Sequence, residues 1–540
     1  MNARDKIYPP IKTETLFYCP LDLSFSNQMS QNDPVAFQLQ VQLHPQEPPR
    51  QHVFLLKGFS AGILLQREPL LRAHLECSVK ELTTYILDGI LQQRRACLPQ
   101  AAGLFLEAFG FHPLSNGDWC TLLGRELVGS PLPFACAHAL PAVELLPSPT
   151  LTQTECIDIL LQCPGEVLLG LAFLMLTSIR SLLSRWDIPF QGVLFLTGRQ
   201  GIGKTTLAKR LFLIYRSSDS GTPAGIIQAS STNASQISLL NQFRDMPLVV
   251  DDLCLSSSKT EERKRRETGA QLVRIGSGDM PITKRVGNQT VSRFCQAGVI
   301  LTAEYDFSAA SDITRCLILP LKEQLSLPKG LSPAFSALLL RQFAAWTVTN
   351  MEVLKQVITG FLEEPNGTLA PRMHTNYACL RGVFACLLMA LNTPSQDAAV
   401  LTNRLKKQVN RSTDHQEELL AALYATVKQC NLSSILLVGM KDYFSLAKNL
   451  DHLDKHDGIL WHGDLCLRKV PLLSFVRKQP GYQNYTIRHI VQELSDIDAL
   501  VVQGDGYTVC LGKKGNKKKA PRVYRLRTSV LKETAKLFEV

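Results

Sequence analysis

The chain lacks the closely spaced cysteine pairs that zinc ribbons and disulfide frameworks need. Its fifteen cysteines are scattered singly over 540 residues, which is typical of reduced thiols in a protein core. The N-terminus has no apolar segment of the kind a signal peptide carries. The most apolar run, residues 167–177, is too short to span a bilayer and predicts a buried helix. We therefore expect a cytoplasmic protein with no membrane partner.

An excess of charge is also missing from most of the chain. Charged residues make up 19% and hydrophobic residues 45%, which are ordinary values for a globular protein with ample core. The net charge is +11, yet residues 505–540 alone hold ten lysines and arginines against three acids. A basic end of this kind indicates a polyanionic partner, although basic tails are also found as plain solvated surface.

The most informative motif lies at residues 198–205, which read Gly-Arg-Gln-Gly-Ile-Gly-Lys-Thr. This is the G-x-x-x-x-G-K-[ST] pattern of a phosphate-binding loop. An apolar run at 192–197 predicts a buried strand before it, and the spacing of leucines in 206–213 predicts a helix after it. A strand, a glycine-rich loop and a helix N-terminus together aim backbone N–H groups at an anion. The motif therefore predicts a bound nucleoside triphosphate.

The roles within this loop follow from its chemistry. Lys204 would reach the β- and γ-phosphates, and the hydroxyl of Thr205 would bind Mg²⁺. The residues predicted to bind the nucleotide are Gly198, Gly201, Gly203, Lys204, Thr205 and Thr206.

Two acids at the end of a second apolar strand, residues 246–252, are expected to complete the site. Carboxylates at the C-terminal end of a buried strand lie where Mg²⁺ and water bind in such enzymes. Asp251, 47 residues after Lys204, is predicted to hold the metal. Asp252 is predicted to orient or deprotonate the attacking water.

Two further segments carry candidate catalytic groups. A third apolar strand over 297–304 places Thr302 where it could sense the γ-phosphate or position water, with Glu304 as another candidate. Arg315 precedes another strand at 316–320. An arginine there could stabilise charge on the nucleotide of a neighbouring subunit, or it could form a salt bridge.

Two basic segments separate the second and third strands. Residues 259–268 alternate acids and bases in a way that favours an exposed helix with i,i+4 ion pairs over a nucleic-acid contact. Residues 279–291 predict a hairpin with a Gly-Asn turn and with Lys284 and Arg285 beside its tip.

This succession resembles the helicase-like AAA+ ATPases of bacterial mobile elements and phages, relatives of superfamily III and MCM-type helicases. The resemblance covers about residues 155–330. It implies ATP as the nucleotide, a ring of identical subunits such as a hexamer, and Thr302 as the sensor. It also implies a DNA-facing hairpin with Lys284 and Arg285, and Arg315 acting on the neighbouring subunit. The family usually has Glu where this chain has Asp252, so either Asp252 or Glu304 would position the water.

The predicted fold is α/β, a P-loop NTPase core of the AAA+ type between two other domains. Residues 1–150 predict a mixed α+β domain, and 151–330 the ATPase core with leading helices from about 154 to 186. Residues 331–432 predict a helical lid or connector. From 433 to 540, helices followed by two strands near 507–511 and 523–527 predict a winged helix. Its wing would lay five lysines along DNA phosphates: Lys513, Lys514, Lys517, Lys518 and Lys519.

Two functions are consistent with this organisation. The first is a Mg²⁺-dependent ATPase that couples hydrolysis to translocation on DNA or to unwinding, as a ring-forming helicase. The second is a DNA-binding regulator or loader in which ATP acts as an assembly switch and no strands are separated. A signalling ATPase whose basic tail binds another acidic partner ranks third.

Overall fold

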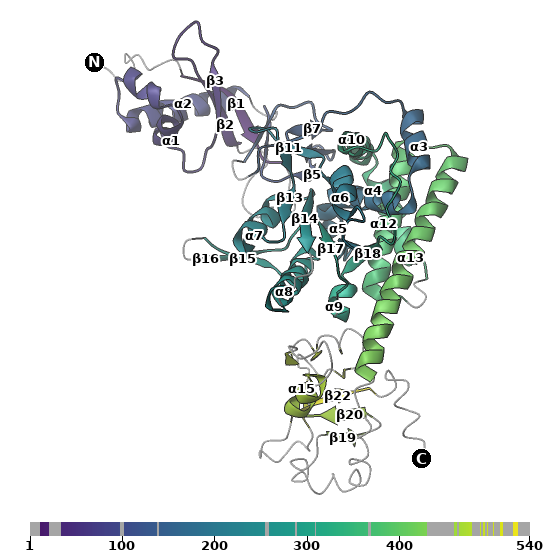
Figure 1. Cartoon of the computed structure of the whole chain (residues 1–540). Helices are drawn as coiled ribbons and strands as arrows, with labels where there is room; N and C mark the ends of the chain where they lie inside the picture. The colour runs from purple at the N-terminus through teal and green to yellow at the C-terminus, as the bar shows by residue number, and fades with distance from the viewer. Residues whose placement is uncertain are drawn as a thin grey trace, which may run out of the picture.

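The computed structural model of the chain describes most of the first 428 residues and separate pieces of the remainder. The described ranges are 11–20, 34–97, 102–137, 140–253, 259–286, 289–307, 309–365, 369–428, 458–461, 464–477, 486–487, 490–491, 494, 500–501, 508–510 and 522–527. An N-terminal unit and a C-terminal unit lie at opposite ends of a larger α/β body (Figure 1).

A parallel five-stranded sheet forms the centre of that body, in the order β13-β14-β17-β10-β18. Its strands are β10 (Val193–Thr197), β13 (Ile226–Gln228), β14 (Pro247–Leu253), β17 (Gly298–Ala303) and β18 (Cys316–Pro320). Helices cover both faces, and so β10 and β17 are buried at every residue. The predicted acidic strand β14 is separated from the phosphate-loop strand β10 by β17. All five strands therefore end at one edge, where a ligand binds in sheets of this class.

Helix α4 (Gly165–Ser178) is the buried helix predicted from the apolar run, and every residue from Val167 onward is buried. It follows α3 (Gln153–Gln162) and precedes α5 (Arg180–Arg185), which confirms leading helices near 154–186. Its Thr177 side chain packs directly on β17, because a β-carbon at Gly298 would meet the Thr177 hydroxyl oxygen at 2.1 Å. No helix among the described residues is both long and apolar enough to cross a bilayer.

The remaining elements of the body link these strands. They are α6 (Lys204–Phe212), β11 (Tyr215–Ser217), β12 (Pro223–Ala224), α7 (Asn233–Gln242), α8 (Lys259–Gly276), β15 (Ile282–Val286), β16 (Gln289–Arg293) and α9 (Ala310–Ile313). The predicted helix over 259–268 is confirmed, whereas its exposure and its i,i+4 ion pairs stay predictions. Helix α8 continues eight residues beyond the prediction because Leu272, Val273 and Ile275 are buried in the core. The predicted hairpin is also confirmed: Val286 pairs with Gln289 across two connecting residues. It projects from the body in Figure 1.

The N-terminal part contains both helices and sheets, as predicted. Its elements are β1 (Ile11–Tyr18), β2 (Pro34–Val41), β3 (Arg50–Leu55), α1 (Ala61–Arg67), the 3₁₀ helix η3 (Pro69–His74), α2 (Val79–Ala96), β4 (Leu104–Leu106), β5 (Gly110–Pro113), β6 (Trp119–Leu123), β7 (Glu126–Val128), β8 (Phe134–Cys136) and β9 (Val143–Leu145). Residues of β1–β3, α1 and α2 share a core of their own. Strands β5, β6 and β9 contribute instead to the core of the parallel sheet.

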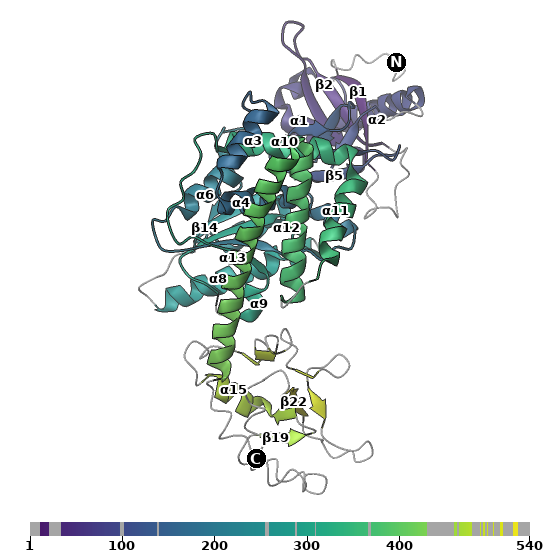
Figure 2. The same cartoon turned by 90° about the vertical axis from the view of Figure 1, so that its right-hand side faces the viewer.

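Residues 331–428 contain four helices among the residues that the structure describes, in the region that the sequence predicted to be helical. They are α10 (Pro333–Thr349), α11 (Met351–Glu363), α12 (Pro371–Ala390) and α13 (Ser395–Lys428). Helices α12 and α13 run side by side along the body, and α13 extends beyond it toward the C-terminal unit (Figure 2).

The C-terminal unit has more strands than predicted. Its elements are β19 (Gly458–Trp461), β20 (Asp464–Leu467), α15 (Lys469–Arg477), β21 (Val509–Cys510) and β22 (Arg522–Leu526), with the sheet order β19-β20-β22-β21. The two predicted strands pair antiparallel, Val509 opposite Val523. Ile490, Val491 and Leu494 of the predicted helix are buried against this sheet. The extra hairpin β19–β20 was not predicted, and the winged helix is not established by these elements.

One buried acid in the body gives a prediction about stability. The carboxylate of Asp245 accepts a hydrogen bond of 2.7 Å from the backbone N–H of Ser181 and another from its hydroxyl. Burial raises the pKa of Asp245 to about 6, and these hydrogen bonds and nearby Arg244 offset the rise only partly. A raised pKa means that the folded state binds the proton more tightly than the unfolded state. The resulting stability is present below the ordinary pKa of 3.8 and is lost as the pH rises through about 6.

Asp245→Asn should therefore flatten the pH dependence of the free energy of unfolding. This one group is expected to make the wild type up to about 3 kcal/mol less stable at neutral pH than at a pH below 3.8. Urea titrations at a pH below 3.8 and at neutral pH would measure the difference in each protein. The exposed Asp219→Asn serves as the control. An unchanged pH dependence in Asp245→Asn would contradict the assignment.

Candidate nucleotide site

The loop between β10 and α6 has the backbone of a phosphate cradle. Gly201 and Gly203 have φ of +77° and +99°, which side-chain-bearing residues rarely adopt. A β-carbon at either would meet no atom within 4 Å, so both face open space. At Gly198 a β-carbon would instead meet the carbonyl oxygen of Leu321 at 2.5 Å. Gly203 caps α6, whose N-terminus therefore opens on this space.

The ammonium group of Lys204 lies over the loop. Its Nζ donates to the carbonyl oxygens of Gly198 at 2.6 Å and Arg199 at 2.9 Å. Burial lowers the pKa of Lys204, while the negative charges of Glu304, Asp251 and Asp252 oppose that shift. The cation therefore lies among three acids at the mouth of the loop.

The Asp251 carboxylate joins three of the predicted residues. Its Oδ1 accepts a hydrogen bond of 2.8 Å from the hydroxyl of Thr205 and one of 2.6 Å from the hydroxyl of Thr302. Asp251 is buried, at 5% exposure. Oxygen ligands of this type suit Mg²⁺, and Thr205 keeps its oxygen lone pairs for a metal while its proton points to the acid.

A β-bulge in β14 makes the side chains of Asp251 and Asp252 point in different directions. Val250 pairs with Leu301, but Leu253 pairs with Ala303, so β14 contains one residue more than β17 across this stretch. Asp252 adopts a left-handed φ of +73° and is exposed. Its backbone N–H donates to the Thr302 hydroxyl at 3.0 Å. The bulge thus leaves Asp251 buried beside Thr205 and places Asp252 at the open side.

An open cavity of about 250 Å³ lies at this loop; the predicted residues Gly198 and Asp251 are not among its described lining residues. Eight residues that the sequence predicted for the nucleotide site, or offered as candidates, line this cavity: Gly201, Gly203, Lys204, Thr205, Thr206, Asp252, Thr302 and Glu304. Gln200, Leu253 and Ala303 also line it and were not predicted as site residues. No sequence signal separates these three from ordinary neighbours of the motifs.

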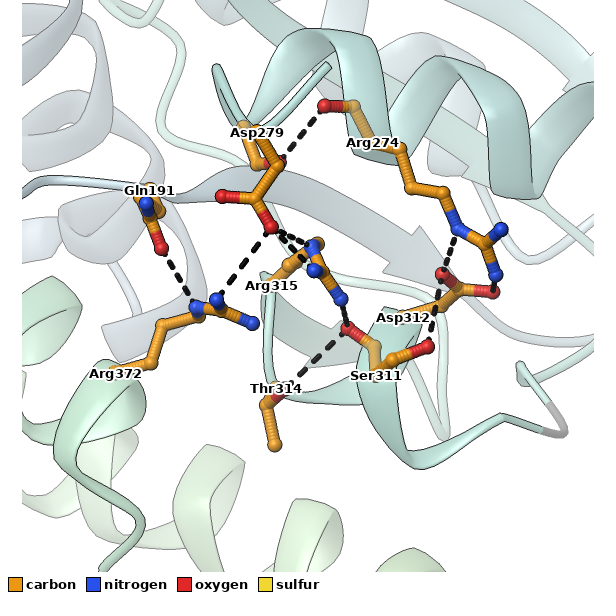
Figure 3. A network of polar contacts seen from close by, with 9 residues as sticks. Gln191, Arg274, Asp279, Ser311, Asp312, Thr314, Arg315 and Arg372 are labelled. Carbon is orange, nitrogen blue, oxygen red and sulfur yellow. Dashed lines mark hydrogen bonds and ion pairs between the residues drawn. The ribbon is translucent and has the colours of Figure 1, made fainter. Parts of the chain in front are cut away.

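Arg315 lies away from this cavity. Its carbonyl oxygen accepts from the N–H of Val193, at the end of β10 opposite the phosphate loop. The guanidinium Nε donates to Asp279 at 2.6 Å, and the side chain is 7% exposed (Figure 3). Of the two predicted interpretations, this geometry favours the ion pair. A role on a neighbouring subunit stays a prediction and would require the guanidinium to leave Asp279.

The predicted DNA contacts are placed only in part. The backbones of Lys284 and Arg285 lie in β15, opposite Val291 and Thr290 of β16. The five lysines predicted along the wing, from Lys513 to Lys519, lie outside the described residues. They remain predictions.

No family model matches the sequence, and no curated protein is detectably similar to it. A solved structure described as "SCCmec type IV Cch - active helicase" matches 97% of this chain and 95% of its own, with a TM-score of 0.50 and 16% identity. Two structures of the JCV helicase, one with a bound acetamide compound, overlap 48% of this chain and 69% and 68% of theirs. Their identity is 14%, and their TM-scores are 0.20 and 0.19.

The Cch match extends over nearly the whole chain and shows a shared fold. The predicted resemblance to helicase-like ATPases of mobile elements is thereby confirmed at the level of the fold, including the α/β class with a parallel sheet behind the phosphate loop. The JCV overlap is too poor to add to this conclusion.

Proposed function

We propose that this chain is a Mg²⁺-dependent ATPase that couples ATP hydrolysis to translocation on DNA or to unwinding. The observation that carries the proposal is the cavity at the end of the parallel sheet. There the glycine cradle, Lys204 and Thr205 line one space, with Lys204 bonded to the loop carbonyls and Thr205 bonded to Asp251. The fold shared with the Cch helicase supports the coupling to DNA.

The residues present fit ATP and Mg²⁺. Gly201 and Gly203 leave space for phosphate oxygens, and Lys204 would pair with them. Thr205 and Asp251 would hold the metal, which when bound neutralises charge on the phosphates. Thr302 holds both acids through one hydroxyl, because that group donates to Asp251 and accepts from the N–H of Asp252. Its proposed part is to fix the acids that act on the metal and the water.

The residue that handles the attacking water is either Asp252 or Glu304. Both line the cavity, and Asp252 lies on its exposed side. A carboxylate within one water of the γ-phosphate can orient that water and take up its proton. The bulge in β14 supports Asp252, because it turns that side chain away from the buried metal ligand.

A ring of subunits would supply what one subunit lacks. Among the lining residues that the structure describes, Lys204 is the sole lysine or arginine. Phosphoryl transfer in this class gains from a second cation, which a neighbouring subunit can contribute. We therefore propose a homo-oligomeric ring, with DNA contacts from the β15–β16 hairpin and the basic C-terminal residues.

Replacing both Lys284 and Arg285 by alanine should weaken the stimulation of ATP hydrolysis by DNA. Loss of two phosphate contacts is expected to raise the DNA concentration for half-maximal stimulation about tenfold at low salt, and by a smaller factor at higher salt, where each contact contributes less. Basal hydrolysis should stay unchanged, because the predicted nucleotide site includes neither residue. A steady-state ATPase assay with and without DNA measures both.

The matched control is Arg72→Ala with Lys80→Ala, which removes the same charge from exposed positions of the N-terminal part. Equal loss of stimulation in both double variants would point to overall charge alone. Wild-type hydrolysis that ignores DNA would count against a motor and favour the ATP-switched regulator.

A further inference from the structure

One carboxylate lies at the base of the projecting hairpin. Asp279 belongs to the short connection, residues 277–281, between the end of α8 and the start of β15. The connection turns at Gly278, where φ is +84°, and the N–H of Met280 donates back to the carbonyl oxygen of Arg274 at 3.2 Å. The position of Asp279 therefore sets where the hairpin leaves the body.

The sheet side of this junction is held firmly. Arg315, immediately before β18, donates from Nε to Asp279 Oδ2 at 2.6 Å and from another guanidinium nitrogen to the carbonyl oxygen of Ser311. Arg274, in the last turn of α8, pairs with Asp312 of α9 at 2.9 Å and 3.3 Å. Figure 3 shows both pairs side by side. They attach the hairpin base to the end of the sheet.

A third arginine comes from the helical region. Arg372, in the first turn of α12, donates from Nε to the side chain of Gln191 at 2.7 Å and from another nitrogen to Asp279 Oδ2 at 3.4 Å (Figure 3). Asn376, one turn later, accepts from the N–H of Gln191 at 3.0 Å. Gln191 stands two residues before β10. One end of α12 thus contacts both the approach to the phosphate-loop strand and the hairpin base.

The two arginines on Asp279 are not equivalent. The Arg315 side chain is 7% exposed, whereas that of Arg372 is 26% exposed and its contact is longer. Both guanidinium groups contact the same carboxylate oxygen of Asp279. Their positive charges repel each other, and this repulsion weakens each contact. The contact with Arg372 is accordingly the one that can be broken and remade while Arg315 keeps Asp279 paired.

Space beside the junction allows the connection to shift. A cavity of about 240 Å³ is lined by Gln191, Ser277 and Gly278 among others. Segments that border a void have fewer packing contacts to lose on movement than segments in a filled core.

We propose that Asp279 and Arg372 are positioning residues that couple the hairpin to helix α12. When α12 holds Asp279 through Arg372, the hairpin base is fixed; when the contact breaks, the connection 277–281 relaxes toward the cavity. The restraint itself depends only on these contacts, and its consequence for DNA-stimulated hydrolysis rests on the proposed function.

The test is Arg372→Ala compared with Arg381→Ala. Both arginines lie on α12, both side chains are 26% exposed, and Arg381 pairs instead with Glu364 near α11. Arg372→Ala leaves the buried Arg315–Asp279 pair intact, so the fold should be kept. Hydrogen exchange of the full chain should be about fivefold faster in residues 277–293 of Arg372→Ala than in wild type. Arg381→Ala should match wild type there.

The second measurement is the ratio of ATPase rates with and without DNA. A coupling role predicts that Arg372→Ala lowers this ratio while basal kcat and KM for ATP stay at the wild-type values. A purely structural role would change basal hydrolysis and the stimulated rate together. Arg372→Lys keeps the charge and should restore part of the ratio.

The outcomes separate the two proposals. Equal exchange of residues 277–293 in Arg372→Ala and Arg381→Ala would overturn the restraint. Faster exchange in Arg372→Ala alone would support it, even if wild-type hydrolysis proved indifferent to DNA, a result that would overturn the proposed function instead. Faster exchange with an unchanged ratio of ATPase rates with and without DNA would overturn the link between this restraint and DNA-stimulated hydrolysis.

Discussion

Lys204→Ala is expected to abolish ATP hydrolysis while the protein stays folded. The ammonium group lies at the mouth of the glycine cradle, where it would balance charge on the transferred phosphate. Loss of such a group typically costs at least about 100-fold in rate. Its present hydrogen bonds end on two loop carbonyls, Gly198 and Arg199. Gly198 is only partly buried and Arg199 is exposed, so water can replace the ammonium with little loss of stability.

The measurement is single-turnover and steady-state hydrolysis with labelled ATP, alongside thermal unfolding without nucleotide. Lys209→Ala is the control, because Lys209 is an exposed lysine on the same helix α6. It removes an equal charge one and a half turns away and should hydrolyse ATP like the wild type. Hydrolysis by Lys204→Ala at a rate near that of Lys209→Ala would show that the cavity is not the catalytic site.

Asp251→Asn should remove the response to Mg²⁺. The amide oxygen of asparagine can still accept from the hydroxyls of Thr205 and Thr302, so the local structure should survive. The negative charge that attracts a divalent cation is lost, and hydrolysis is expected to fall about 100-fold or more. Titration of Mg²⁺ against nucleotide binding and against hydrolysis would show a large rise in the Mg²⁺ concentration required.

Asp252→Asn provides a comparison of the same chemistry one residue along the chain. Because Asp252 faces the open side of the cavity, this variant should keep Mg²⁺-dependent nucleotide binding and lose turnover. If Glu304 handles the water instead, Asp252→Asn will hydrolyse ATP and Glu304→Gln will not. A variant Asp251→Asn with a normal Mg²⁺ requirement would contradict the assignment of the metal ligand.

The sequence predicted the parts of the site that depend on short stretches of chain. The phosphate loop needs glycine at fixed positions for positive φ, so its pattern is visible in eight consecutive residues. The buried helix α4 is equally plain, because its apolar residues are continuous rather than periodic. The acidic end of β14 was visible as well, since an apolar strand followed by two acids is a local feature.

What the sequence could not show depends on residues far apart in the chain. The bulge that separates Asp251 from Asp252 appears only in the register of β14 against β17. The hydrogen bonds of Thr302 with Asp251 and Asp252 follow from that same register. No local sequence pattern distinguishes this role of Thr302 from that of a γ-phosphate sensor. Arg315 was ambiguous because its partner Asp279 lies 36 residues earlier. The hairpin β19–β20 was missed because nearby apolar residues were assigned to helices.

Strand displacement on a forked DNA duplex distinguishes a helicase from an ATP-switched regulator in one experiment. The wild-type protein should separate the strands only with both ATP and Mg²⁺. Lys204→Ala should bind the same fork without separating it. Intact duplex after complete ATP hydrolysis, with the protein bound to the fork, would contradict the helicase and leave the ATP-switched regulator as the function to pursue.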